Sequence, residues 1–235
     1  IMSKEVTYSK IPEGYYMKKL GGGKMGTCYL TEDGKVYKEF YKKYYFFNKL
    51  KTLSYYESDL IAFPEELVFL EANTARDLKG YLMQYVDGDK LINIEDAVRF
   101  KEFVTALDTF EREMFRLSRQ GILFNDLNQE NLIWTIDGKL KAVDTDLYDP
   151  TQDDEFGNAG KENIKELAET IIGQFRLGTN FKNQELNEAV LKCGAYGRMR
   201  CSSLLEKFAE EGEKEQNKSI ETIGDFNDSI TLLKK

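Results

Sequence analysis

Acidic and carboxamide side chains crowd into one short stretch of the sequence, FNDLNQEN at residues 124–131. Apolar residues border it on both sides, GIL before it and LIW after it. A surface loop would carry such residues for solubility. A catalytic loop would instead need one carboxylate and one carboxamide at a fixed separation, which Asp126 and Asn131 provide five residues apart. Because Asp and Asn also favour turns, the stretch alone does not decide between the two interpretations.

A glycine-rich stretch, LGGGKMG, lies near the start of the chain. Its Gly21, Gly23 and Gly26 follow a G-x-G-x-x-G pattern, which alone is a weak signal. The dinucleotide-binding form of this pattern requires a helix after it. Here the strand-like segments TCYL and KVYKEF follow, so the stretch fits a hairpin whose bare backbone amides, including that of Gly22, approach phosphate oxygens. A flexible turn without a ligand is the alternative.

A lysine and a carboxylate would complete a phosphate site next to this hairpin. Lys38 lies in the next strand-like segment, where an inward lysine could bridge two phosphates as a point charge. Such a lysine needs a carboxylate to hold it, and we assign Glu57, with Glu65 and Glu66 as weaker candidates. A lysine on a strand is more often a solvated edge residue, so this prediction depends on the glycine stretch upstream.

Residues 1–87 are expected to form one lobe with five strands and one helix. Strand-like segments separated by the glycine turn and by a tight EDGK turn occupy residues 15–40. Apolar residues at helical spacing predict a helix over residues 42–57. Pro64 closes this segment before two further strands, ELVFLE and GYLMQYV.

Residues 88–235 are expected to form a second, mainly helical lobe. The polar stretch DGDKLINIED at residues 87–96 is a candidate hinge between the lobes. Apolar residues on one face predict a long helix from Phe100 that Gly121 terminates, and a DG turn predicts a hairpin in NLIWTIDGKLKAV. Amphipathic patterns predict further helices over residues 161–175, 184–210 and 218–233.

Composition excludes several classes of function. The chain has 235 residues, 41% hydrophobic and 31% charged, which suits one large or two small globular lobes. Its net charge of -8 argues against a broad basic face, so we expect no nucleic-acid partner. The sequence has no histidine, which excludes Ser-His-Asp and Cys-His hydrolysis and the commonest zinc sites.

Hydropathy and cysteine usage bear on the compartment. No apolar run approaches the ~20 residues needed to span a bilayer, and the N-terminus lacks the layout of a signal peptide. We therefore expect a cytoplasmic protein without a membrane span, while delivery into another cell as an effector stays open. Cys28, Cys193 and Cys201 match no zinc pattern, so buried or idle thiols are the expectation.

Three short motifs, in the same order, resemble those of the protein kinases. GILFNDLNQENLIW is similar to the catalytic loop of that family, and KLKAVDTD to the strand and metal-binding turn that follow it. The separations, five residues from Asp126 to Asn131 and thirteen from Asn131 to Asp144, are those that the family uses. GYLMQYVDG resembles the last strand of the first lobe and its hinge. The resemblance implies a two-lobed, protein-kinase-like α+β fold whose first lobe is a five-stranded antiparallel sheet with one helix.

This resemblance implies a role for each residue of the site, with ATP and Mg²⁺ (or Mn²⁺) as cofactors. Asp126 would orient the acceptor hydroxyl and take its proton late, while Lys38 and the glycine amides hold the nucleotide. Asn131 and Asp144 are hard oxygen ligands suited to the metal. The adenine would be lined by Cys28, the gatekeeper Met83, and the hinge residues Gln84, Tyr85 and Val86.

Departures from the family pattern change what the resemblance implies. Phe124 and Asn125 replace the His-Arg pair before the catalytic aspartate, so activity would not require phosphorylation of an activation loop. Asn128 replaces a lysine often found there, which predicts slow turnover. Thr145 and Asp146 replace Phe-Gly, and the resulting DTD is similar to turns of atypical bacterial kinases and of some small-molecule phosphotransferases.

Three classes of function stay open. The first is an atypical, minimal bacterial serine/threonine protein kinase that transfers the γ-phosphate of ATP to a hydroxyl. The second is a small-molecule kinase of the aminoglycoside or choline sort, which usually carries large acidic insertions that this short second lobe lacks. The third is a pseudokinase that acts as a binding module, against which the retained Lys38, Asp126, Asn131 and Asp144 speak. Transfer of AMP also stays open, because it depends on nucleotide orientation.

Overall fold

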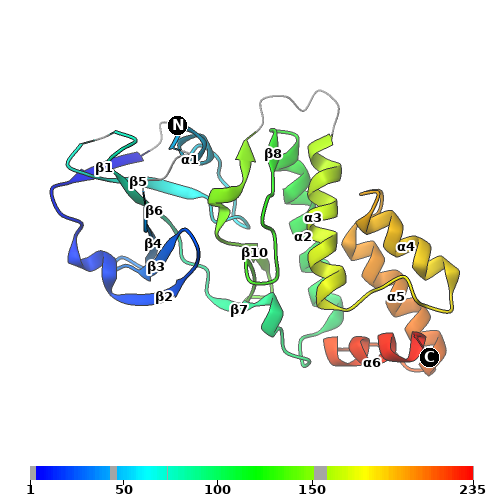
Figure 1. Ribbon diagram of the computed structural model, residues 1–235. Coiled ribbons are helices and arrows are strands. Elements are labelled where there is room, and N and C mark those ends of the chain that lie inside the picture. The colour runs from blue at the N-terminus through cyan, green and yellow to red at the C-terminus, as the bar shows by residue number, and fades with distance from the viewer. Residues whose placement is uncertain (1–3, 43–46, 73, 151–157, 235) are drawn as a thin grey trace. The chain divides into compact units, whose positions relative to one another are not determined.

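The computed structural model describes residues 4–42, 47–72, 74–150 and 158–234. Within these ranges the chain is α+β, as predicted, with six α-helices and a mixed six-stranded sheet beside smaller sheets (Figure 1). It divides into two compact units, Ile1–Val86 with Val143–Asp146, and Asp87–Ala142 with Leu147–Lys235. The sequence predicts a single boundary after residue 87, whereas Val143–Asp146 belongs with the first unit.

A six-stranded sheet forms the first unit. Its strands are β1 (Lys4–Tyr8), β2 (Lys18–Gly22), β3 (Gly26–Leu30), β4 (Lys35–Phe40), β5 (Pro64–Leu70) and β6 (Leu78–Gln84). They lie in the order β1-β5-β6-β4-β3-β2, and all neighbours are antiparallel except β1 and β5. The prediction of five antiparallel strands is therefore wrong, because β1 adds a parallel sixth strand. That strand, KEVTY, is an edge strand of five residues, too short for a clear alternation of apolar and polar residues.

Each face of this sheet buries its own hydrophobic cluster. Side chains alternate between faces along a strand, so Val36, Lys38 and Phe40 share one face of β4 and Tyr37 takes the other. One cluster contains Val36, Phe40, Leu67, Phe69, Tyr81 and Met83. The other contains Tyr37, Ile11, Val68 and Leu82. Lys38 therefore lies on the face of the first cluster, where it is 4% exposed.

The helix of the first unit ends earlier than predicted. Helix α1 (Phe47–Leu53) packs on β5 through Phe47, whose ring centroid lies 5.9 Å from that of Phe69. After Leu53 the backbone N–H groups of Tyr55 and Tyr56 donate to the carbonyls three residues earlier, which tightens the last turn and ends the helix. Glu57 therefore lies beyond α1 instead of at its end. Residues 43–46 of the predicted helix lie outside the described part of the chain.

Helices dominate the second unit. They are α2 (Phe100–Ser118), α3 (Asn158–Gln174), α4 (Gln184–Gly194), α5 (Cys201–Gln216) and α6 (Ile223–Leu233). A three-stranded sheet joins β7 (Gly88–Lys90), β9 (Leu132–Thr135) and β10 (Leu140–Ala142), while β8 (Ile122–Leu123) pairs with β11 (Asp149–Pro150). Single-turn 3-10 helices cover Glu13–Tyr16, Leu91–Asn93 and Thr145–Leu147 of the chain.

Helix α2 is the central element of the second unit. Its face with Phe103, Leu107 and Phe110 is completely buried. Glu111 is buried on the same helix, and its carboxylate accepts hydrogen bonds from the backbone N–H groups of Cys201 and Ser202. Burial raises the pKa of Glu111, and these donors oppose the shift. A buried carboxylate on α2 thus satisfies the first N–H groups of α5.

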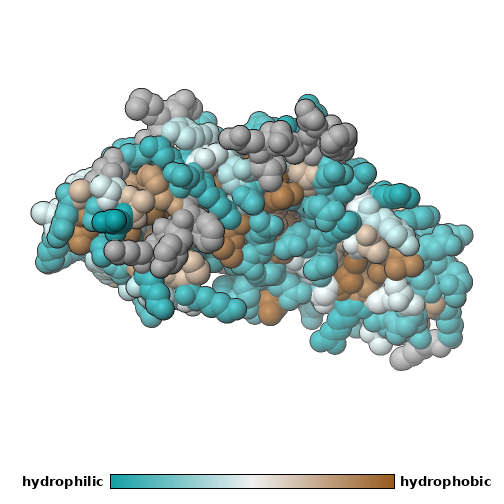
Figure 2. Space-filling model, turned by 45° about the horizontal axis from the view of Figure 1, so that its top comes forward, coloured by the Kyte–Doolittle hydropathy of each residue, from teal (hydrophilic) through white to brown (hydrophobic). Residues whose placement is uncertain are grey.

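The surface carries no extended apolar face in the view of Figure 2, which is mostly hydrophilic with separate hydrophobic patches. Large exposed hydrophobic residues are dispersed along the sequence, among them Met17, Tyr41, Ile136 and Tyr196. Among the helices within the described ranges, none is long and apolar enough to cross a bilayer.

Gly80 allows β6 to approach β4 at the backbone of Lys38. A Cβ at Gly80 would lie 1.9 Å from the Lys38 carbonyl oxygen, so an added methyl group forces the strands apart. We expect Gly80→Ala to lower the free energy of unfolding by about 1–3 kcal/mol. Gly21→Ala is the matched control, because a Cβ there meets nothing within 4 Å. Urea denaturation followed by circular dichroism measures both, and equal stabilities would contradict this packing.

Candidate functional site

A buried ion-pair cluster in the first unit joins β4 to a segment more than 100 residues later in the chain. The Lys38 ammonium donates to the carboxylates of Asp144 and Asp146, and the contact with Asp146 measures 2.7 Å. The Asp146 side chain is 1% exposed, whereas that of Asp144 is 40% exposed. A buried ammonium requires such partners, because an unpaired charge in the interior is strongly destabilising. Lys38 is therefore held from inside by Asp146 and from the surface side by Asp144.

The two carboxylates of this cluster have different environments. Burial raises the pKa of Asp146 to about 6, helped by the negative charge of Asp144 and opposed by Lys38. Burial alone would lower the pKa of Lys38, but the charges of Asp146 and Asp144 outweigh it and raise that pKa above its ordinary value. The lysine therefore stays cationic. Thr145, between the two acids, donates its hydroxyl to the Ala62 carbonyl at 2.9 Å and fastens the segment to the first unit.

These contacts correct the predicted partner of Lys38. The sequence assigns Glu57, which lies beyond the end of α1, but the carboxylates that contact Lys38 are Asp144 and Asp146. The weaker candidates Glu65 and Glu66 pair with lysines of β4 and β1 instead. By its sequence alone, Asp146 is only a departure from the family pattern. The signal that could have identified it is the second acid of the DTD turn.

The glycine stretch forms the turn between β2 and β3. The chain leaves β2 at Gly22, and the N–H of Gly23 donates to the Gly26 carbonyl at 3.0 Å. A Cβ at Gly21 or Gly23 would meet nothing within 4 Å, so there is space beside the backbone at these two positions, although the Gly23 N–H itself is already bonded to the Gly26 carbonyl. Gly26 has a different role, because a Cβ there would lie 2.1 Å from the Glu39 carbonyl oxygen. Its glycine lets β3 approach β4.

The residues predicted to line an adenine fall into two groups. Cys28 lies directly opposite Lys38 in the β3–β4 ladder, and burial raises the pKa of its thiol to about 11. Cys28 and Val86 pack against the hydrophobic cluster that contains Met83. Gln84 and Tyr85 are exposed. The structure thus brings three of the five predicted residues to the face of the sheet that carries Lys38.

The second unit holds the other predicted group, Asp126 and Asn131. The Asn131 side-chain amide donates to the Asp126 carbonyl at 2.9 Å and to its carboxylate at 3.1 Å. The Asn128 amide donates to the other carboxylate oxygen at 3.0 Å. The Asn128 side-chain oxygen also accepts from the backbone N–H groups of Glu130 and Asn131. Asn128, in place of the family's lysine, therefore helps to orient the Asp126 carboxylate.

Asp126 and Asp144 share an unusual backbone conformation. Their φ angles are 64° and 60°, in the left-handed region. A residue with a side chain occupies this region at a cost of roughly 1–3 kcal/mol and persists there only where its surroundings enforce it. Such residues cluster at functional sites. The two acids for which the sequence predicts a catalytic and a metal-binding role are both held in this way.

Helix α3 anchors the loop that carries Asp126. Asn163, itself 2% exposed, accepts a hydrogen bond from the Phe124 N–H at 2.7 Å, and the Thr170 hydroxyl donates to the Leu127 carbonyl. Burial raises the pKa of Glu166, while hydrogen bonds from the loop backbone near Leu127 oppose that shift. The three side chains lie on one face of α3. The sequence predicts this helix but not that it anchors the loop. Polar residues on the otherwise apolar, buried face of the helix are the signal that could have indicated this role.

The two predicted metal ligands lie in different units, Asp144 in the first and Asn131 in the second. Within the described part of the chain, no three His, Cys, Asp or Glu side chains form a group that could hold an ion alone. Asp144 is partly exposed, and Asn131 uses its amide nitrogen for Asp126, which leaves its side-chain oxygen for a ligand. Protein-bound Mg²⁺ typically takes one or two carboxylates together with substrate phosphates. Each of the two side chains, taken within its own unit, offers an oxygen of the kind that this mode of binding uses.

Comparison of the sequence with protein-family models and with curated proteins found no match. The resemblance to protein kinases therefore rests on the motifs and spacings of the chain itself, and the roles of the site residues stay predictions.

We expect Asp146 to make the folded protein less stable as the pH rises from about 4 to about 6. Its pKa is about 6 in the folded chain against an ordinary value of 3.8, so over this interval the folded state retains a proton that the unfolded state releases. The free energy of unfolding therefore falls with rising pH. Asp146→Asn removes this contribution, so the variant should lose less stability, or gain more, over the same interval.

The control for this titration is Asp137→Asn. A hydrogen bond from Lys139 lowers the pKa of Asp137 from 3.8 to about 2, so its folded and unfolded states differ in protonation mainly below pH 4, and its loss should leave the slope above pH 4 nearly unchanged. Urea denaturation at several pH values measures the slopes. Identical slopes for the wild type and Asp146→Asn would contradict the raised pKa.

Proposed function

We propose that the chain is an ATP- and Mg²⁺-dependent phosphotransferase that passes the γ-phosphate of ATP to a hydroxyl group of a protein. The observation that carries this proposal is the contact between Lys38 and Asp144. The sequence assigns these two residues separately to the nucleotide and to its metal, and they meet across 106 positions of the chain. Few structural roles would call for an open glycine turn, a buried lysine and a partly exposed aspartate together.

The lysine cluster supports nucleotide binding. Asp146 keeps Lys38 charged and in place from the buried side, so phosphate oxygens would meet a positioned cation. The open backbone at Gly21 and Gly23 would cover the phosphates. Mg²⁺, held by Asn131 and Asp144, would neutralise part of the phosphate charge. Cys28, Met83 and Val86 would offer the adenine an apolar surface.

The Asp126 loop supports the transfer step. Asp126 would orient the acceptor hydroxyl and accept its proton as the phosphoryl group is transferred. Asn128 and Asn131 each donate to one oxygen of its carboxylate, which restricts the rotation of the side chain. The loop carries no cation beside Asp126 to neutralise the transferred group, so turnover should be slow.

A protein acceptor fits the second unit better than a small cationic acceptor. The helices α3 to α6 follow one another through the short segments 175–183, 195–200 and 217–222. Small-molecule kinases usually carry large acidic insertions in this part of the fold, and these segments leave no room for one. We therefore propose a protein hydroxyl as the acceptor and keep a small-molecule acceptor as the second candidate.

ATP labelled separately at the γ- and the α-phosphate tests this function. Incubated with Mg²⁺ and casein as a general acceptor, the wild type should transfer γ-label to casein or to itself. Asp126→Asn and Asp144→Asn should each lower the rate by about 100-fold or more, because they remove a proton acceptor and a metal ligand. Partial acid hydrolysis of the labelled protein should yield labelled phosphoserine or phosphothreonine.

The control for these variants is Asp137→Asn, the same chemical change in the exposed turn between β9 and β10. It should retain wild-type activity. Transfer of α-label would point to AMP transfer, and the absence of any transfer by the wild type would contradict the proposed reaction.

Cys28 reports on nucleotide binding without any turnover. We expect ATP to slow the alkylation of Cys28 by iodoacetamide several-fold, because the adenine would cover the thiol. Since the pKa of this thiol is about 11, the reaction should be run at about pH 9, and mass spectrometry should separate Cys28 from the buried Cys193 and Cys201. Inorganic triphosphate is the control, because it has no adenine. Equal rates with and without ATP would count against the adenine pocket.

A further inference from the structure

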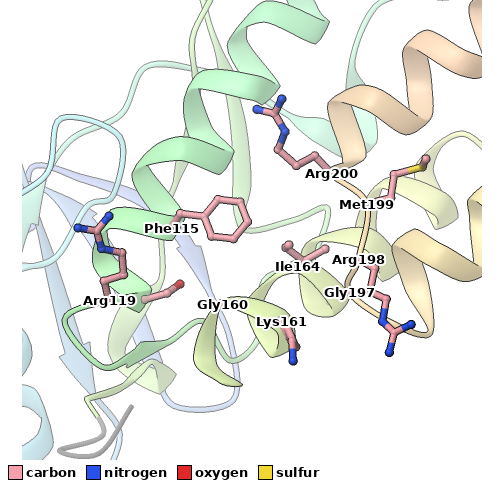
Figure 3. Close-up of a pocket in the computed structure, with 10 residues that line it drawn as sticks. Phe115, Arg119, Gly160, Lys161, Ile164, Gly197, Arg198, Met199 and Arg200 are labelled. Atoms are coloured by element: carbon pink, nitrogen blue, oxygen red, sulfur yellow. The ribbon is translucent and has the colours of Figure 1, made fainter. Parts of the chain in front are cut away.

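A pocket of about 350 Å³ lies in the second unit, where the end of α2, the start of α3 and the segment between α4 and α5 meet (Figure 3). Its floor is apolar, and Figure 3 shows the side chains of Phe115 and Ile164 pointing toward one another from α2 and α3. Gly160 keeps this floor open, because a Cβ there would lie 3.6 Å from the Phe115 ring and a longer side chain would extend into the space. None of these residues belongs to the proposed nucleotide site.

Basic side chains lie at the edge of this apolar floor, and in Figure 3 those of Lys161 and Arg198 extend away from Phe115 and Ile164. The basic residues are Arg119, which directly follows α2, Lys161 from α3, and Arg198 and Arg200 from the segment before α5. Arg200 pairs with Asp108. Across the described ranges, Arg119, Lys161 and Arg198 make no ion pair with an acidic side chain. All three are exposed. The pocket therefore combines an apolar floor with cations that are available to a ligand.

The local sequence explains why α2 leaves one arginine available. Arg112 pairs with Asp108 four residues earlier, and Arg116 pairs with Glu113 three residues earlier. Arg119 has no acid at either spacing. Acidic residues of α2 thus neutralise Arg112 and Arg116 but not Arg119, which lines the pocket.

The charge of the pocket is opposite to that of the chain as a whole, which is -8. An acidic partner would be attracted to this basic pocket although the chain as a whole is acidic, which favours docking there in one orientation. We infer that the pocket docks an acidic peptide segment of a partner protein. One aromatic or large aliphatic side chain fills the floor at Phe115 and Ile164, and flanking carboxylates meet Arg119, Lys161 and Arg198.

An acidic peptide explains more of the pocket than other anions do. The phosphates of a nucleic acid or free inorganic phosphate would use the cations but would leave the apolar floor in contact with water. Burying an apolar side chain on that floor contributes roughly 25 cal/mol per Å² of area, which a simple anion forgoes. This inference stands apart from the proposed phosphotransferase, because docking uses no residue of the nucleotide site.

Fluorescence anisotropy of a fluorescein-labelled peptide, in which glutamates flank one central phenylalanine, tests the inference. The wild type should bind it, and added salt should weaken the binding. The double variant Arg119→Glu with Lys161→Glu should bind at least about tenfold more weakly, since it reverses two of the available charges. Gly160→Leu should also lose about tenfold, although it changes no charge, because its side chain fills the floor.

Two controls separate the pocket from general charge effects. Lys139→Glu reverses an exposed charge in the turn between β9 and β10 and should bind as the wild type does. A peptide with alanine in place of the phenylalanine should bind about tenfold more weakly. Thermal unfolding should be unchanged in the charge variants, whose side chains are exposed.

Several results would overturn the inference. They are no binding of the peptide to the wild type, equal binding by Gly160→Leu, equal binding of the alanine peptide, or displacement of the peptide by inorganic phosphate at equal concentration. Tighter binding of a single-stranded oligonucleotide, lost in the double variant, would assign the pocket to nucleic acid instead.

Discussion

Burial of the Lys38 ammonium group on the hydrophobic face of a sheet is the constraint on which the first unit depends. The lysine is 4% exposed, so it requires negative partners, and the chain supplies them from Val143–Asp146. This segment groups with the first unit, although the residues on both sides of it group with the second. Thr145 adds a hydrogen bond to the Ala62 carbonyl. The segment that returns to the first unit is therefore the same segment that neutralises the buried lysine.

The predicted catalytic and metal-binding acids are held by the same physical means. Asp144 and Asp126 both have a left-handed backbone, and each lies next to residues that fasten it. For Asp144 these are Lys38 and the buried Asp146, and for Asp126 they are two asparagine amides and the anchoring face of α3. A group whose position is fixed before a ligand arrives loses less entropy when it acts, which is the advantage that catalytic sites share. The charge of Lys38 is fixed in the same way, because the buried Asp146 holds the ammonium from one side while the partly exposed Asp144 pairs with it from the surface side.

Local patterns predicted the elements that short-range chemistry determines. Turns at the glycine stretch and at EDGK indicate β2, β3 and β4, and helical periodicity indicates the helices of the second unit, although it does not mark the break at residues 195–200 between α4 and α5. The prediction fails where a contact spans the chain, because no periodicity links Lys38 to Asp146, and the sequence indicates Glu57 only through its predicted helix. Strand β1 pairs with β5 at the sheet edge, which depends equally on distant sequence. Gly26 shows a further limit, since one pattern of glycines serves both an open turn and close strand packing.

Calorimetric titration with ATP in the presence of Mg²⁺ tests most directly whether the Lys38 cluster is a nucleotide site. The wild type should bind one ATP per chain, and Lys38→Met should weaken binding at least about tenfold, because it removes the cation and keeps most of the side-chain volume. Lys35→Met, on the same strand but paired with Glu65 at the surface, should bind as the wild type does. A wild type that releases no heat with ATP, or a Lys38→Met variant that binds equally tightly, would contradict the assignment.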